Sequence, residues 1–216
     1  MKFDPKRYKI YTWKSGVMLH WIINPGLLIN ELILGQRIPK INLEDRTSNK
    51  PRLERSYVPC PHCETLHDSR TWSTQNGTGF KNWFGLYCPN CGEVIPCLMN
   101  AFTFIILAFT FPLWGWFKGT LKRAWLAKQP QRFEQLEVEN IYNPYSGKGW
   151  VRYGIIWAAF MYVLMTFIFP LLTNDPITKK GILLGIPIWL VGGLLFGYFL
   201  HRFMGKQGGG AATEEV

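Results

Sequence analysis

The sequence predicts a membrane protein with a small β-rich module closed by four cysteines and an α-helical membrane region of two to three transmembrane helices. Four of the five cysteines form two pairs, and two residues separate the members of each pair. This spacing lets both sulfurs of a pair face one metal ion. After the second pair come three uncharged apolar runs, over 98–117, 153–172 and 182–200. Each has about the length needed to cross a hydrocarbon core.

Composition supports a large surface at the level of the lipid headgroups. The chain of 216 residues has a net charge of +10 and contains 10 Trp, 9 Tyr and 15 Phe. Aromatic and basic side chains gather where a protein meets the headgroup layer. We therefore expect the basic segments next to the membrane to contact anionic lipid, and we disfavour nucleic acid as a partner.

Residues 1–36 form a basic and aromatic N-terminal part in which we expect interfacial helices. The stretch 17–34 is apolar in bulk, but Pro25 and Gly26 interrupt it and Glu31 would be costly in lipid. Two short helices that lie in the interface, or that pack on a partner, are less costly than a span. Residues 37–55 contain six Lys/Arg and no apolar period, which predicts an exposed polar linker.

Residues 56–97 form the predicted metal module. Its expected ligands are Cys60, Cys63, Cys88 and Cys91. Short strands over 57–59 and 84–87 would deliver the two pairs, and Gly92 would permit a tight turn after the second pair. A module of this size has too little core to fold without a staple, so the binding energy of the metal would be its folding energy.

The four-cysteine set resembles the zinc-ribbon module, and the Cys-Pro-Asn-Cys-Gly end is also similar to a rubredoxin knuckle. The resemblance covers about 40 residues and implies a bound zinc, or iron as the alternative, without an attached reaction. Glu64 stands where a rubredoxin knuckle has glycine, which favours structural zinc. We expect His62 and His67 to be surface residues, because the cysteines already complete a set of four ligands. We expect Cys97 to be a small buried apolar residue.

The remainder divides into a first membrane segment (98–117), a basic connector (118–152), a transmembrane hairpin (153–206) and a disordered tail (207–216). Acids, Lys and Arg are absent from the interiors of the three apolar runs, so no ion pathway is visible in the sequence. Small residues recur there at four-residue spacing, which suits close helix packing within the chain or against another subunit. They are Gly154 and Ala158, Gly181 and Gly185, and Gly193 and Gly197. Gly is also common in transmembrane helices for other reasons.

The topology contains a conflict. With three spans, the metal module and the connector lie on opposite faces, yet the seven Lys/Arg of the connector and the reduced thiols of the module both favour the cytosol. Either the module is outside, or 98–117 is a non-spanning segment bent at Pro112. We place the module on the cytoplasmic side of a bacterial inner membrane.

Three functions compete. The leading hypothesis is a non-enzymatic accessory or scaffold subunit of a membrane protein complex. The second is a membrane-tethered electron carrier with iron in the four-thiolate site. The third is an enzyme or transporter that uses the polar residues of the N-terminal part, His20, Asn24, Asn30 and Glu31.

Overall fold

The computed structural model describes residues 3–136, 138, 141, 143 and 147–204. The predicted disordered tail lies outside them. The chain divides into two compact units, the first with described residues 3–49, 54–136, 138 and 141, the second with 50–53, 143 and 147–204. Each unit has its own packing and is described by itself.

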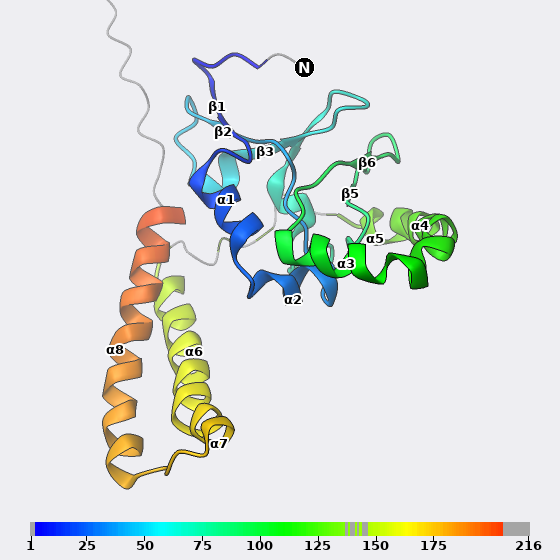
Figure 1. Ribbon diagram of the computed structural model, residues 1–216. Helices are drawn as coiled ribbons and strands as arrows, with labels where there is room; N and C mark the ends of the chain where they lie inside the picture. Colours follow the sequence, from blue (N-terminus) through cyan, green and yellow to red (C-terminus); the bar gives the residue numbers. More distant parts are fainter. Residues whose placement is uncertain (1–2, 137, 139–140, 142, 144–146, 205–216) are drawn as a thin grey trace, which may run out of the picture. The chain divides into compact units, whose positions relative to one another are not determined.

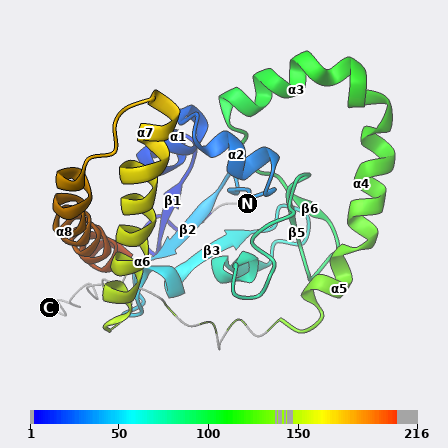
Figure 2. The same cartoon turned by 90° about the horizontal axis from the view of Figure 1, so that it is seen from below.

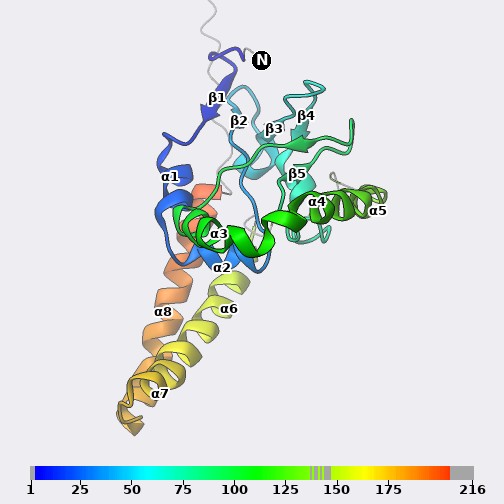
Figure 3. The same cartoon turned by 45° about the vertical axis from the view of Figure 1, so that its right-hand side comes forward.

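The first unit is built on an antiparallel sheet whose four strands follow one another in chain order (Figures 1 and 3). They are β1 (Tyr8–Tyr11), β2 (Asn42–Asp45), β3 (Ser56–Pro59) and β4 (Leu66–Asp68). A separate two-stranded hairpin consists of β5 (Leu86–Tyr87) and β6 (Val94–Ile95). The sheet brings the N-terminal part, the predicted linker and the metal module into one unit.

The prediction that 37–55 is an exposed polar linker is wrong at β2, which is an inner strand of the sheet. Leu43 is completely buried there, and the acids after it are buried because each meets an arginine. Glu44 forms an ion pair with Arg55 at 2.7 Å, and Asp45 forms one with Arg7 at 3.3 Å. Because these acids are paired with arginines, β2 can be an inner strand although its composition is that of a polar loop.

Two short helices lie between β1 and β2 in the chain, and the longer helices follow β6. In the first unit they are α1 (Gly16–Ile23), α2 (Leu27–Leu32), α3 (Ala101–Trp114), α4 (Lys118–Ala127) and α5 (Gln129–Phe133), with the 3₁₀ turns η2 (Ser69–Trp72) and η3 (Gly115–Phe117). A further 3₁₀ turn, η1 (Arg52–Arg55), contains residues of both units. Two short helices therefore replace a single N-terminal span. Asn24 separates α1 from α2, because its side chain accepts the N–H of Gly26 at 2.8 Å. Figures 1 and 3 place α2 and α3 at one edge of the unit, away from β1–β3.

The first apolar segment bends after α3. Figure 2 shows α3 and α4 running in clearly different directions, joined by η3. The expected bend at Pro112 is wrong by a few residues, because Pro112 lies inside α3. The bend occurs where Gly115 lacks a side chain, and the ring of Phe111 lies 2.9 Å from where its Cβ would stand.

The second unit is a helical hairpin (Figure 3). Its elements are α6 (Gly149–Val163), a π-helical turn η4 (Leu164–Ile168), α7 (Phe169–Thr173) and α8 (Lys179–Met204). Asn174 ends α7 in the left-handed conformation, with φ of 57°. The hairpin begins four residues before the predicted boundary.

The small residues of the hairpin lie between its own helices. A Cβ on Gly193 would stand 2.3 Å from the carbonyl oxygen of Gly154 and 2.5 Å from the Cβ of Ala158. A Cβ on Gly197 would stand 2.4 Å from the carbonyl oxygen of Trp150. Gly185 packs on Tyr162, whereas Gly181 is exposed. This small-residue face packs α6 on α8 within the chain, rather than being free for another subunit.

Three helical segments are long and apolar enough to cross a membrane: Ala101–Ala127, Gly149–Thr173 and Lys179–Met204. Their apolar side chains are exposed over most of each segment. A water-soluble protein rarely exposes apolar surface of this extent, and the length and composition of these helices are consistent with a membrane protein.

Candidate metal centre

The two cysteine pairs occupy equivalent turns at the tips of two hairpins. The first turn joins β3 to β4, and the second joins β5 to β6. In the first, Cys60 N–H donates to the Thr65 carbonyl at 3.0 Å, and Glu64 N–H donates to the Cys60 carbonyl at 3.0 Å. In the second, Cys88 N–H donates to the Glu93 carbonyl and Gly92 N–H to the Cys88 carbonyl, both at 2.9 Å. We call these turns the two knuckles.

The fourth residue after the first cysteine of each knuckle has a positive φ. It is 59° at Glu64 and 76° at Gly92. This left-handed conformation costs little at glycine and roughly 1–2 kcal/mol at other residues. The first knuckle therefore has the left-handed backbone that glycine favours, although Glu64 stands at that position.

The four sulfurs meet at distances that suit a tetrahedral ion. The Cys60 and Cys91 sulfurs are 3.7 Å apart, as are the Cys63 and Cys88 sulfurs. These are opposite edges of one tetrahedron, and all four sulfurs lie within 4.8 Å of one another. With a Zn–S bond of about 2.3 Å, tetrahedral sulfurs lie about 3.8 Å apart. All five cysteines are free thiols, so the four clustered sulfurs are a candidate metal site, which we call the tetrad, and not a pair of disulfides.

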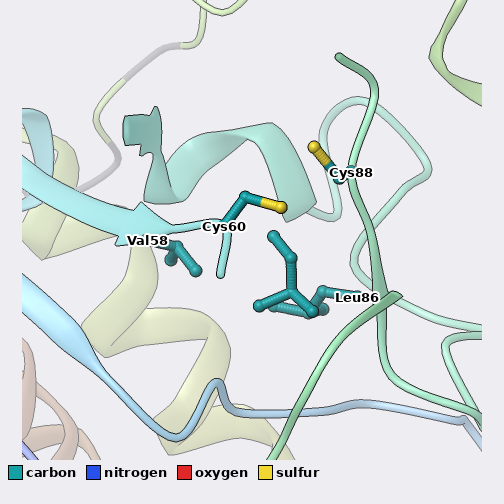
Figure 4. Close-up of a cluster of buried hydrophobic side chains, with 5 residues drawn as sticks. Val58, Cys60, Leu86 and Cys88 are labelled. Carbon is teal, nitrogen blue, oxygen red and sulfur yellow. The ribbon is translucent and has the colours of Figure 1, made fainter. Parts of the chain in front are cut away.

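The tetrad belongs to the core of the first unit. Figure 4 shows Val58 and Cys60 facing Leu86 and Cys88, side chains of the two hairpins, in one buried cluster. Cys60 and Cys88 are completely buried, whereas Cys91 is exposed. The ion position is thus buried on the β3 and β5 side and open toward solvent at Cys91.

Burial and hydrogen bonding shift the pKa values of the thiols in opposite directions. Burial raises the pKa of Cys60 and of Cys88 above the usual value. Hydrogen bonds from Asn90 and Thr65 instead lower the pKa of Cys63 to about 5. Two of the ligands therefore carry protons at neutral pH without an ion, and metal binding must release them.

His67 is not the surface residue that the sequence indicates. Its Nε2 lies 3.1 Å from the sulfur of Cys88, and its ring stacks edge-on against Trp72 at 5.8 Å. Burial lowers the pKa of His67, so the ring is neutral at pH 7 and can donate one N–H to the sulfur. His62, in contrast, is exposed. Cys97 is partly buried at the edge of the cluster, and burial raises its pKa to about 12.

The polar residues of the third hypothesis do not converge. His20 and Asn24 contact each other at the surface, and Asn30 is half-buried. Glu31 is completely buried, where it forms an ion pair with Arg37 and accepts the backbone N–H of Asn100 at 2.8 Å. Its carboxylate thus acts as a structural lock between α2 and the start of α3.

Sequence reasoning missed Arg37 and Asn100 in this lock. Asn100 caps α3 through Phe102 N–H at 2.9 Å, and its amide donates to the carbonyls of Trp21 and Asn24. Asparagine is a helix-start residue, so Asn100, near the beginning of the uncharged run, is a signal that would have identified the cap. No local signal pairs Glu31 with Arg37, because a fold-dependent turn brings them together.

Comparisons with known proteins identify no function. A family model described as a domain of unknown function (DUF8250) matches residues 11–107, less than half of the chain. The matched part begins in β1, contains all four ligand cysteines and ends inside α3. No curated protein and no solved structure matches the chain.

Proposed function

We propose that this protein is a non-enzymatic accessory subunit of an integral membrane complex, with a structural zinc in its first unit. We call this first unit the head. One observation carries the proposal: four thiols from two hairpins converge on a single tetrahedral position. A complete set of four protein ligands leaves no position for water or substrate, which disfavours catalysis at the ion.

Cys60, Cys63, Cys88 and Cys91 would hold the zinc, and the ion would supply a cross-link between the two knuckles. The strands on either side are only two to four residues long. Structural zinc sites contribute apparent binding free energies of roughly 10–16 kcal/mol at neutral pH. That is enough to determine whether these strands stay folded.

The other polar and small residues serve the protein's own architecture. Glu31 is neutralised by Arg37 and Asn100, and Gly154 and Gly193 hold the hairpin together. These arrangements support a structural role over transport or catalysis. We place the head on the cytoplasmic side of a bacterial inner membrane, where thiols remain reduced for the metal.

An electron carrier with iron is the second candidate, and the exposure of Cys91 favours it. An iron bound in this tetrad would lie one ligand from solvent, a short path for electron exchange with a partner. The chain purified from cells grown with both metals decides between them. Equimolar zinc in a colourless protein supports the structural site, whereas a red protein with equimolar iron supports the carrier.

The subunit proposal is tested by native electrophoresis of the tagged full chain after mild detergent extraction. We expect the wild type to migrate well above its mass of 25.0 kDa plus detergent. Cys88→Ser should lose both the zinc and the larger species. Cys97→Ala is the matched control, because Cys97 lies beside the tetrad without belonging to it. A wild-type chain that runs as a monomer overturns the proposal, even with zinc bound.

A further inference from the structure

We propose that α1, α2 and α3 form a membrane platform embedded in one leaflet of the bilayer. On this proposal, Ala101–Ala127 does not cross the membrane, and α4 returns along the headgroups to the face from which α3 departs. The inference is independent of the metal and of any partner subunit.

Hydrogen bonds fix the N-terminal end of α3 to the head. The side-chain amide of Asn100 donates to the carbonyls of Trp21 and Asn24, in and just after α1. The backbone N–H of Asn100 donates to the carboxylate of Glu31. Just before it, Leu98 N–H donates to the Ile38 carbonyl at 2.8 Å. The helix therefore begins against α1 and α2.

Hydrogen bonds also fix the chain after α3 to the same unit. The indole of Trp125, near the end of α4, donates to the carbonyl of Lys81 at 2.6 Å and its ring contacts Phe84. In α5, the guanidinium of Arg132 donates to the carbonyl of Phe80 at 2.7 Å. Both ends of Ala101–Ala127 thus contact one compact unit, as a loop does and a membrane span does not.

The helix α3 is also short for a membrane crossing. The helix α3 has 14 residues, about 21 Å at 1.5 Å per residue. A hydrocarbon core is about 30 Å thick, so α3 alone is too short to cross it. The turn at η3 redirects the chain before it can continue (Figure 2).

The residues of α3 and α4 indicate that lipid covers the exposed apolar surface. The helix α3 is uncharged and apolar on all sides, which is typical of a helix surrounded by hydrocarbon. Its most exposed side chains include Phe109 at 84% and Leu113 at 77%, and Trp116 follows at 86%. Exposed cations come next on α4, at Lys118, Lys122 and Arg123. Apolar residues followed by Trp and then by cations match the order of acyl chains, interface and anionic headgroups.

The chain itself brings this surface to a bilayer. About 15 residues separate α5 from α6, a reach of at most about 50 Å. The platform can therefore reach the membrane that holds the hairpin. With α6 and α8 as the two crossings, the basic N-terminal part and the basic connector share one face. Charge counting and thiol chemistry then agree.

Single-cysteine labelling of membrane vesicles tests the topology. An impermeant maleimide is applied to right-side-out and inverted vesicles that contain Thr74→Cys in the head, Thr120→Cys in α4 or Lys179→Cys at the start of α8. Each substitution is made in the zinc-loaded Cys97→Ala chain, and that chain alone measures the labelling of the four remaining cysteines. We expect the first two positions to label from the same face and Lys179→Cys from the other. Labelling of Thr120→Cys from the face opposite to both other positions shows that α3 crosses, and overturns the proposal.

A second measurement distinguishes lipid from a protein cover. A spin label at Phe109→Cys is studied in the purified full chain, reconstituted in phosphatidylethanolamine and phosphatidylglycerol vesicles. We expect more collisions with oxygen than with a water-soluble nickel complex, and the reverse at Thr74→Cys. A label at Phe109→Cys that is open to nickel in these vesicles shows that lipid does not cover α3, and overturns the proposal.

Discussion

The imidazole of His67 is the one described side chain outside the tetrad whose ring nitrogen contacts a ligand sulfur. A hydrogen bond to a metal-bound thiolate removes part of its negative charge and fixes the direction of its lone pairs. His67 receives its own orientation from Trp72, which packs against the same cluster. This contact therefore links the metal position to the hydrophobic core.

Replacing His67 by Phe keeps a ring against Trp72 and removes the N–H donor. We expect the zinc affinity to fall by about tenfold, the lower end of the effect of losing such outer-shell partners. Competition with a chromophoric chelator on the purified full chain measures it. His62→Phe is the control, since His62 is exposed, and should leave the affinity unchanged. Equal affinities for both variants would mean that the contact does not support the thiolate.

The knuckle backbones provide the second residue-scale prediction. We expect Gly92→Ala to weaken zinc binding by about fivefold, equivalent to about 1 kcal/mol, because alanine is strained at positive φ. Sterics are not the cause, since the nearest atom to an added Cβ is 3.7 Å away. Glu64→Gly should bind zinc as tightly as the wild type or more tightly. Glu64→Ala removes the carboxylate without relieving φ; if it matches Glu64→Gly, charge rather than backbone strain determines the affinity.

The residues that sequence identified and those it missed differ in the range of their interactions. The four ligand cysteines were predicted because a two-residue spacing is a local signal that already sets geometry. His67 and Cys88 are 21 positions apart, and Asn100 lies 69 positions from Glu31. Such pairs arise only when a sheet or a helix pair forms. Single-sequence periodicity contains no information about them.

Among the elements, the hairpin depends on backbone approach between α6 and α8. We expect Gly193→Ala to lower its free energy of unfolding by about 1–3 kcal/mol, because the new methyl group would overlap Gly154 and Ala158. Titration with a denaturing detergent measures the loss. Gly192→Ala is the matched control, with no neighbouring atom within 4 Å. Equal losses in both variants would assign the effect to helix propensity.

The elements were predicted unequally for a physical reason. Long uncharged runs predicted the helices of the membrane region to within a few residues, because lipid requires length and apolarity. Strands β1 and β2 were missed because each is four residues long and carries charges. The acids of β2 form ion pairs with arginines outside the strands, Asp45 with Arg7 just before β1 and Glu44 with Arg55 in η1. A polar composition therefore concealed an inner position in the sheet.

At the scale of the whole molecule, the two units are stabilised by different interactions. The head depends on short strands, two small buried clusters and the tetrad, so its folding should depend on the metal. The hairpin depends on glycine contacts between helices and contains none of the candidate ligands. This difference predicts that each unit can be disrupted without the other.

Removing zinc from the full chain with a strong chelator should expose Arg70 and Lys81 to trypsin while most of the helical circular dichroism remains. The cause is loss of the cross-link between the knuckles, whereas the α6–α8 contacts need no ion. Cys88→Ser should reproduce the cleavage without changing the resistance of the hairpin to denaturing detergent. Gly193→Ala should do the opposite, lowering that resistance with zinc content and trypsin protection intact. If chelation weakens the hairpin as much as Gly193→Ala does, the two units fold as one, and the stability of this protein has a single source.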